Sequence, residues 1–178
     1  HQEELCIVTE LLHDNLYVFG RYCRMCGDAE YFTLARVASI GHQLMRALRF
    51  VHGAGIIHAD IKPENIVFRS YTACTVTLID FGTSAFIADP SESYAQSRDY
   101  RAPEVVLGLT YAQKIDVWSV GAVLAEIYTG RVLFKSRSAA ALLTRMQGIV
   151  NEALPPAMLR DGRGRNAHDL VTRAGVVF

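Results

Sequence analysis

The sequence predicts a mainly helical domain with a few short β-strands that line a cleft, an α+β arrangement. Apolar residues recur at three- and four-residue steps over residues 34–51, and residues 114–128 are apolar almost throughout, which favours two long helices. Short β-branched runs at residues 56–57, 66–68 and 76–79 are typical of small strands. A chain of 178 residues is one domain's worth and is long enough to bury a sizeable core.

The amino-terminal part predicts a strand followed by a short helix. Residues 5–8 form an apolar, strand-like run, and residues 9–12 lead out of it. Asn15 begins a short helix or turn, and the loop through Gly27 and Asp28 is polar. Without further information this segment indicates only an edge strand.

The first long helix is expected to start at Thr33, run to about His52 and stop at Gly53, since threonine caps helix starts and glycine commonly ends helices. His42 and His52 are expected at the surface or in packing rather than as ligands. The predicted core face of this helix consists of Leu34, Val37, Gly41, Leu44, Leu48 and Val51.

A polar run at residues 58–65 lies between two predicted strands. Pro63 lacks a backbone donor and disfavours helical dihedrals at Lys62, so this run is predicted to be a loop. It carries a carboxylate, an ammonium and an amide, and a second carboxylate, Asp80, follows the strand at residues 76–79. We therefore expect these polar groups to lie on rigid strand edges and to converge.

The combination of Asp60, Lys62, Asn65 and Asp80 suits phosphoryl transfer. That reaction needs a carboxylate to accept the proton of the attacking hydroxyl and a cation near the migrating phosphoryl group. It also needs oxygen ligands for Mg²⁺, which binds carboxylates, amides, phosphates and water. Taken singly, an Asp or Asn on a loop is an ordinary turn residue, so the prediction depends on the ordered set.

The second half of the chain predicts one buried helix and one shorter helix. Residues 114–128 leave almost no polar face and are expected to be buried on nearly all sides, with Gly130 ending the helix. Asp116 at its start is either a buried acid with partners or an ordinary first-turn carboxylate favoured by the helix dipole. Ser138 is expected to cap a helix through about Met146, and Leu142, Leu143 and Met146 share one side of it.

Two polar stretches have open interpretations. By composition alone, residues 88–101 are a mobile surface loop. The basic residues within 160–165 indicate a solvated loop, or else a docking site for an acidic partner.

Composition excludes several functions. Lys and Arg number 18 and Asp and Glu number 18, so charge provides no argument for nucleic acid or an anionic membrane. No apolar run reaches about 18 residues, and no secretory signal is visible, so we expect a soluble protein of the cytoplasm or the nucleus. Cys23 and Cys26 have the spacing of metal and redox sites. No second pair follows at zinc spacing, so we interpret the spacing of these two cysteines as a coincidence.

Three motifs in order resemble the protein-kinase signature: His58-Ala59-Asp60 with Asn65, then Asp80-Phe81-Gly82, then Ala102-Pro103-Glu104. From Leu5 to about Phe134 the chain resembles the carboxy-terminal lobe of a eukaryotic protein kinase. Residues 97–104 look like the CMGC group. Residues 94–98 and 58–60 look most like the dual-specificity tyrosine-regulated and homeodomain-interacting kinases.

The resemblance implies roles for individual residues. Asp60 would be the catalytic base, Lys62 the cation, and Asn65 and Asp80 the Mg²⁺ ligands. Ser97 would bridge Asp60 and Lys62. The other implied positions are Glu10 and Leu12 in the adenine-binding hinge, His58 packed under Phe81 within the core, and Asp116 accepting backbone hydrogen bonds from the catalytic loop.

The resemblance also implies an activity: transfer of the ATP γ-phosphate to serine or threonine of protein substrates, with a preference for proline after the target residue. Tyr94 would be autophosphorylated. Ala59 stands where many kinases have the arginine that grips the activation-loop phosphate, and Arg98 and Arg101 could replace it. The physiological substrate and the oligomeric state are not indicated.

One departure concerns the rest of the nucleotide site. No Gly-x-Gly-x-x-Gly occurs and no strand lysine is identifiable, so residues 1–178 are expected to be a kinase-domain fragment. Residues 1–12 would end the small lobe and form the hinge, and residues 135–178 would be a truncated CMGC-type insert region. The fragment alone is expected to bind ATP weakly and turn over negligibly.

Two other classes compete with the enzyme. A pseudokinase or scaffold would display the helical lobe to partners, but it has no need of Asp60, Lys62, Asn65 and Asp80 together. A metal-binding regulatory protein built on Cys23 and Cys26 lacks further ligands.

Overall fold

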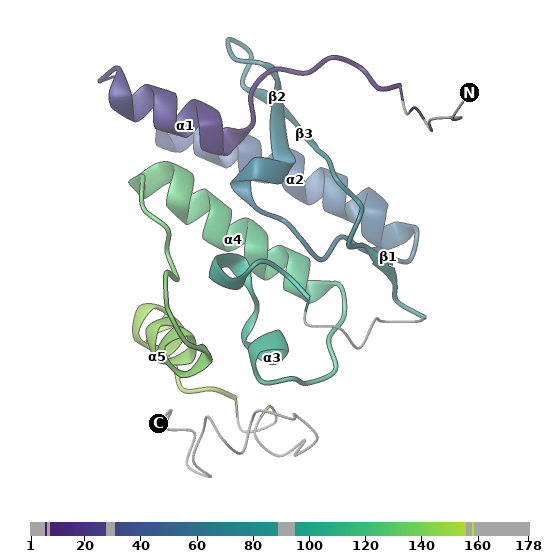
Figure 1. Ribbon diagram of the computed structural model, residues 1–178, viewed down its shortest axis with the longest axis vertical. Coiled ribbons are helices and arrows are strands. Elements are labelled where there is room, and N and C mark those ends of the chain that lie inside the picture. Colours follow the sequence, from purple (N-terminus) through teal and green to yellow (C-terminus); the bar gives the residue numbers. More distant parts are fainter. Residues whose placement is uncertain (1–5, 7, 28–30, 89–94, 156–157, 159–178) are drawn as a thin grey trace, which may run out of the picture.

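The computed structural model describes residues 6, 8–27, 31–88, 95–155 and 158. Helices dominate the described residues, and the strands are short and form two separate pairs (Figure 1). The helices are α1 (Leu16–Met25), α2 (Leu34–Gly53), α3 (Pro103–Val106), α4 (Lys114–Thr129) and α5 (Ala139–Val150). The strands are β1 (Ile56–Ile57), β2 (Ile66–Ser70), β3 (Thr75–Leu78) and β4 (Ala85–Phe86), and two 3₁₀ helices are η1 (Pro63–Asn65) and η2 (Arg98–Tyr100).

Helix α2 confirms the predicted start and most of the predicted core face. The Thr33 side chain accepts a hydrogen bond from the Arg36 backbone N–H, which is the capping geometry expected of threonine. Val37, Gly41, Leu44, Leu48 and Val51 are buried as predicted. The assignment of Leu34 to the core was wrong, because this residue lies in the first turn at the edge of the stripe and is 67% exposed. Ile40, in the middle of the stripe, is fully buried instead.

Helices α2 and α4 cross in close contact at Gly41. The two helices lie side by side in Figure 1, and α2 also contacts β3. A Cβ atom added at Gly41 would lie 2.9 Å from Cδ1 of Leu124 on α4. Glycine at this position therefore leaves room for the Leu124 side chain between the two helices.

This close approach leads to a stability prediction. Replacing a helical glycine by alanine normally stabilises by roughly 0.5 to 1 kcal/mol, because glycine loses more backbone entropy on folding. Gly148 on α5 has open space around it, so Gly148→Ala should show that gain in denaturant unfolding. Gly41→Ala should instead lower the free energy of unfolding by about 1 kcal/mol, because Leu124 must move. Equal gains from both substitutions would contradict this account of the crossing.

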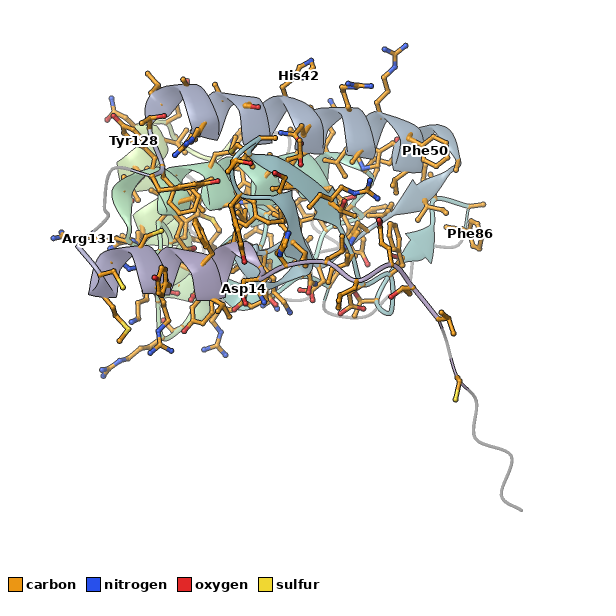
Figure 2. The ribbon with its side chains drawn as sticks, turned by 90° about the horizontal axis from the view of Figure 1, so that it is seen from above. Asp14, His42, Phe50, Phe86, Tyr128 and Arg131 are labelled. Carbon is orange, nitrogen blue, oxygen red and sulfur yellow. The ribbon has the colours of Figure 1, made fainter. Side chains whose placement is uncertain are left out.

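Helix α4 runs through the centre of the fold, but it is less buried than predicted. Asp116 and Ser119 are fully buried, and the buried apolar residues of the helix are Ile115, Val120, Ala122, Val123 and Ile127. Val117 is 41% exposed and Tyr128, near the last turn, is 56% exposed, so the expectation of burial on nearly all sides was wrong (Figure 2). One strip of the helix faces a groove of about 770 Å³ that α3 and α5 also line. Gly130 ends the helix in the left-handed conformation, as predicted.

Helix α5 begins as predicted and ends later. The Ser138 hydroxyl accepts the Ala141 backbone N–H, and Leu142, Leu143 and Met146 are buried. The helix continues past the predicted end at Met146 to Val150, where Asn151 adopts the left-handed conformation. No residue between Met146 and Val150 breaks helical geometry, although Gly148 lowers the local propensity.

The strands form two antiparallel pairs, β1 with β4 and β2 with β3. The predicted runs at 56–57 and 66–68 lie in β1 and β2, and the run at 76–79 lies in β3 except for Ile79, which follows the strand; β4 was not anticipated. The predicted strand at residues 5–8 is not observed at Cys6 and Val8, which are exposed and irregular; Leu5 and Ile7 lie outside the described residues. The chain then passes along β2, where the His13 N–H donates to the Phe68 carbonyl and the Phe68 N–H donates to the Asp14 carbonyl.

Helix α1 places Cys23 and Cys26 in different environments. Asn15 caps this helix by accepting the Val18 N–H, which confirms the predicted start. Cys23 is buried in the core and Cys26 is exposed at the end of the helix, and neither forms a disulfide. Within the described ranges, no group of three or more His, Cys, Asp or Glu side chains could hold a metal ion, and no helix is long and apolar enough to cross a membrane.

Candidate active site

The Asp116 carboxylate of α4 holds the loop at residues 58–62 through hydrogen bonds to its backbone. Asp116 Oδ2 accepts the His58 backbone N–H and Oδ1 accepts the Ala59 backbone N–H, both at 2.9 Å. His52 Nε2, at the end of α2, lies 2.8 Å from Asp116 Oδ2. Asp116 is fully buried and has these three partners, so the first alternative, a buried acid with partners, is confirmed. The sequence analysis missed His52 as its partner, because 64 positions separate the two residues.

The side chains of Asp60, Lys62 and Ser97 contact one another next to the backbone that Asp116 holds. Lys62 Nζ lies 2.6 Å from Asp60 Oδ2, and the Ser97 hydroxyl donates to Asp60 Oδ1 at 2.8 Å. Lys62 Nζ also lies 3.4 Å from Ser97 Oγ, so the serine bridges the other two groups. The Lys62 backbone is extended and Pro63 starts a single 3₁₀ turn, which is the loop expected from the proline. The three groups thus form a compact cluster around one carboxylate.

Asn65 is tied to the same carboxylate. Its Nδ2 donates to the Asp60 carbonyl at 2.9 Å and to Asp60 Oδ2 at 3.2 Å. Both contacts use the amide nitrogen, so the amide oxygen is the atom that Asn65 can offer to a cation.

The β2–β3 pair brings Asp80 to this cluster. Asn65 precedes β2 and Ile79 follows β3, and the Ile79 N–H donates to the Asn65 carbonyl at 2.9 Å. The Ile79 carbonyl accepts His58 Nε2 at 3.0 Å. Asp80 is the next residue, with a left-handed φ of 65° and an Oδ1 that accepts the Gly82 N–H. Hydrogen bonds therefore place the segment that carries Asp80 directly beside the loop that carries Asp60.

His58 lies next to Phe81, with 4.9 Å between the ring centroids and an angle of 60° between the planes. His58 is fully buried and packs against Phe81, which confirms the expectation for the histidine, whereas Phe81 itself is 47% exposed. Ser84, which the sequence analysis did not single out, donates to the His58 carbonyl.

The donor set fits magnesium better than a metal held by protein ligands alone. Asn65 and Asp80 supply an amide oxygen and a carboxylate, and Mg²⁺ commonly binds one or two carboxylates together with water and substrate phosphates.

A cavity of about 510 Å³ opens beside Asp60. Its walls come from the catalytic loop, from the residues after Asp80 and from the segment that ends at Ser97. The lining residues are Ala59, Asp60, Gly82, Thr83, Ser84, Ala85, Ala95, Gln96, Ser97 and Tyr111. A peptide hydroxyl that entered this cavity could reach the Asp60 carboxylate.

The residues predicted to dock a phosphotyrosine differ in accessibility. Arg98 is exposed, whereas Arg101 is 5% exposed. The Arg101 Nε–H donates to the Ala95 carbonyl at 2.9 Å, and its Nη2 donates to the Gln96 carbonyl at 2.5 Å. Arg101 thus binds the backbone of its own segment. Tyr94 lies outside the described residues.

Glu64 and Glu126 are two partly buried acidic residues that lie close to each other. The Tyr100 hydroxyl donates to Glu126 Oε2 at 2.7 Å, and Glu64 Oε2 is buried with no hydrogen-bond partner among the described residues. Burial and the neighbouring Glu64 raise the pKa of Glu126, although the Tyr100 hydrogen bond and Arg24 act in the opposite direction. Burial and the Glu126 carboxylate likewise raise the pKa of Tyr100.

Two further predicted positions lie elsewhere. Glu10 is exposed and forms an ion pair with Arg69 of β2, and Leu12 is half-buried.

Burial raises the pKa of Glu104 on α3, although Lys114 acts to lower it.

This arrangement defines the class of protein. A family model for the protein kinase domain matches residues 1–163 of the chain. The chain belongs to the protein kinase family.

Comparison with individual relatives narrows the group of kinases that this chain resembles. It is 41% identical to the serine/threonine-protein kinase ppk5 of Schizosaccharomyces pombe over 92% of this chain and 19% of that protein. It is 38% identical to a probable dual specificity protein kinase, the YAK1 homolog of Encephalitozoon cuniculi, over 92% of this chain and 39% of that protein. It is 36% identical to the dual specificity tyrosine-phosphorylation-regulated kinase 2 of Drosophila melanogaster over 89% of this chain and 21% of that protein. The resemblance to dual-specificity tyrosine-regulated kinases is confirmed, and the chain spans less than two-fifths of each of these three relatives.

Proposed function

We propose that the protein transfers the γ-phosphate of ATP to serine or threonine hydroxyls of other proteins. The observation that carries this proposal is the Asp60 carboxylate, held by Lys62 Nζ at 2.6 Å and by the Ser97 hydroxyl at 2.8 Å beside a cavity. Asp60 orients the acceptor hydroxyl and takes its proton as the oxygen attacks the γ-phosphorus. The bond from the γ-phosphorus to the bridging oxygen breaks, and ADP leaves.

Three residues assist this step. Lys62 offsets the negative charge that develops on the transferred group. Asn65 and Asp80 would hold magnesium, which when bound neutralises charge on the phosphate oxygens. Two hydrogen bonds support this assignment, because they keep the two segments adjacent before substrate arrives: the Ile79 N–H donates to the Asn65 carbonyl, and His58 Nε2 donates to the Ile79 carbonyl.

The hinge assignment of Glu10 and Leu12 is also a proposal. Its support is that His13 and Asp14, which follow directly, form backbone hydrogen bonds with Phe68 of β2, the strand that Asn65 precedes. We assign residues 1–178 to the hinge and the carboxy-terminal lobe, because no glycine-rich phosphate loop occurs among them.

A preference for proline after the target residue has physical support in the segment beside Ser97. Arg101 occupies the carbonyls of Ala95 and Gln96. A substrate backbone N–H placed next to these carbonyls would lose its hydrogen bond with water and find no free acceptor. Proline has no N–H, so it would not incur that cost.

The test is phosphate transfer from radiolabelled ATP to protein and peptide substrates with magnesium present. The protein at its full natural length should phosphorylate serine followed by proline faster than serine followed by alanine. The 178-residue chain by itself should show negligible turnover, because the groups that position the ATP phosphates are missing from it. Absence of transfer by the full-length protein would refute the proposed activity.

Autophosphorylation at Tyr94 gives a separate prediction. Phosphate on this tyrosine would add about two negative charges near Arg98, and the new charge-assisted hydrogen bonds would order the segment. Tyr94→Phe should therefore lower kcat for an exogenous substrate by roughly tenfold or more. Tyr17→Phe, at an exposed position on α1, is the matched control. A fully active Tyr94→Phe enzyme would refute the role of this phosphate.

A further inference from the structure

Gln96 uses all of its hydrogen-bonding groups although it sits in a loop. Its side-chain Nε2 donates to the Ile115 carbonyl at 2.8 Å and to the Ser119 hydroxyl at 2.7 Å. Its Oε1 accepts the Ala102 backbone N–H at 2.9 Å. The residue is 7% exposed, so these contacts are shielded from water.

The backbone of Gln96 is strained as well as buried. Its φ is 66°, in the left-handed region that residues other than glycine, asparagine and aspartate rarely adopt. Such a conformation persists only where the surroundings hold it. Here the three side-chain contacts and the Arg101 guanidinium hold it.

This residue connects directly to the catalytic loop. The Gln96 backbone N–H donates to the Ala59 carbonyl at 3.0 Å, and Ala59 precedes Asp60. The next residue, Ser97, donates its hydroxyl to Asp60 Oδ1. Gln96 is therefore one residue away from Asp60's hydroxyl partner and is bonded to the residue just before Asp60.

Helix α4 holds both sides of the Asp60–Ser97 contact. Asp116 binds the backbone of His58 and Ala59, and Ser119 binds the Gln96 side chain. Residues 116 and 119 are three positions apart on a helix, so their side chains lie on the same face of α4. The Ser119 hydroxyl in turn donates to the Tyr100 carbonyl, which secures the segment beyond Ser97.

We propose that Gln96 is a positioning residue: its side-chain amide fixes Ser97 against Asp60 and thereby sets the orientation of the carboxylate toward the acceptor hydroxyl. It acts through Ser97 and does not itself contact the substrate. This inference rests on the proposed kinase activity and adds a residue and a mechanism to it.

The experiment compares Gln96→Glu and Gln96→Gly in the protein at its full natural length. Gln96→Glu keeps the acceptor for Ala102 but turns a carboxylate oxygen toward the Ile115 carbonyl, where the amide donated. Gln96→Gly removes the side chain while relieving the left-handed backbone. Both should lower kcat by roughly 10- to 100-fold, the scale expected for a misplaced catalytic group. The KM for ATP should stay within about twofold, since neither change touches ground-state nucleotide binding.

A double-mutant cycle separates positioning from a general structural role. In a Ser97→Ala background, Gln96→Glu should lower kcat no further, because the contact that Gln96 positions is already absent. Gln43→Glu is the matched control: Gln43 Nε2 donates to the Cys74 carbonyl and Oε1 accepts the Val76 N–H, the same bonding pattern away from Asp60. Its kcat should equal that of the unsubstituted protein.

The outcomes decide the proposal. Unchanged kcat in Gln96→Gly, or a full loss from Gln96→Glu in the Ser97→Ala background, would overturn it. If Gln96→Glu unfolds, Gln96→Gly with a retained melting temperature decides alone. Amide hydrogen exchange at Ala102 in the 178-residue chain needs no catalysis: its protection should fall in Gln96→Gly but not in Gln43→Glu. Absence of activity in the unsubstituted protein would refute the kinase function itself, whereas the exchange result would still report on Gln96.

Discussion

Asp60→Asn is expected to lower kcat for phosphorylation of a protein substrate by roughly 10²- to 10⁴-fold, the range that a general base contributes. Asparagine has nearly the same shape, and its remaining oxygen can still accept the Ser97 hydroxyl that now lies 2.8 Å from Oδ1. Its amide nitrogen would face Lys62 Nζ, which now lies 2.6 Å from Oδ2, so that ion pair is lost. The variant can no longer take the proton of the attacking hydroxyl.

The measurement should separate chemistry from folding and binding. Steady-state kinetics on the full-length protein should show the loss in kcat, with a melting temperature close to that of the unsubstituted protein. Glu152→Gln makes the same carboxylate-to-amide change at an exposed position near the end of α5 and should leave kcat unchanged. If Asp60→Asn kept more than half of the activity, Asp60 would not be the catalytic base.

Asp116→Ala is expected to cause the largest loss of stability among single substitutions in this region. The fully buried carboxylate accepts the backbone N–H groups of His58 and Ala59 and lies 2.8 Å from His52 Nε2. Alanine would leave two buried backbone donors unpaired and His52 without its partner. Breaking a buried charged network in this way typically costs about 3 to 5 kcal/mol.

Denaturant unfolding of the 178-residue chain measures this loss. Because small domains are stable by only about 5 to 15 kcal/mol, Asp116→Ala could leave too little folded protein for a fit, so two milder variants accompany it. Asp116→Asn keeps one acceptor oxygen, and His52→Ala removes only one contact; each should cost about 1 to 3 kcal/mol. Asp14→Ala, which removes an exposed hydrogen bond from Tyr71, should cost less than about 1 kcal/mol. A cost for Asp116→Asn as small as that of Asp14→Ala would contradict the anchoring role.

Local chemistry accounts for what could be predicted about the fold. The starts of α1, α2 and α5 follow from capping side chains that accept a backbone N–H two or three residues later. The loop at Lys62 follows from the proline after it. The β2–β3 pair follows from two short β-branched runs separated by polar residues. These features depend on neighbours in the chain, so their residues identify them.

The failures came where distant parts of the molecule decide the outcome. Leu34 has the right spacing for the core but lies at the edge of the buried stripe, where nothing covers it. Val117 on α4 is apolar like its neighbours, yet it faces a groove. Periodicity indicates which residues share a face, whereas exposure depends on what packs against that face.

By itself, the sequence determined the chemical groups of the candidate site and their order: Asp60, Lys62, Asn65 and Asp80 on loops next to short strands. Only the tertiary structure decided which partners hold them. It paired Asp116 with His52, which is 64 positions away, bonded Ser97 to Asp60, and placed Gln96 between α4 and the catalytic loop. The physical reason is that a buried polar group must find its hydrogen-bond partner in space, and adjacency in space depends on how the helices pack rather than on distance along the chain.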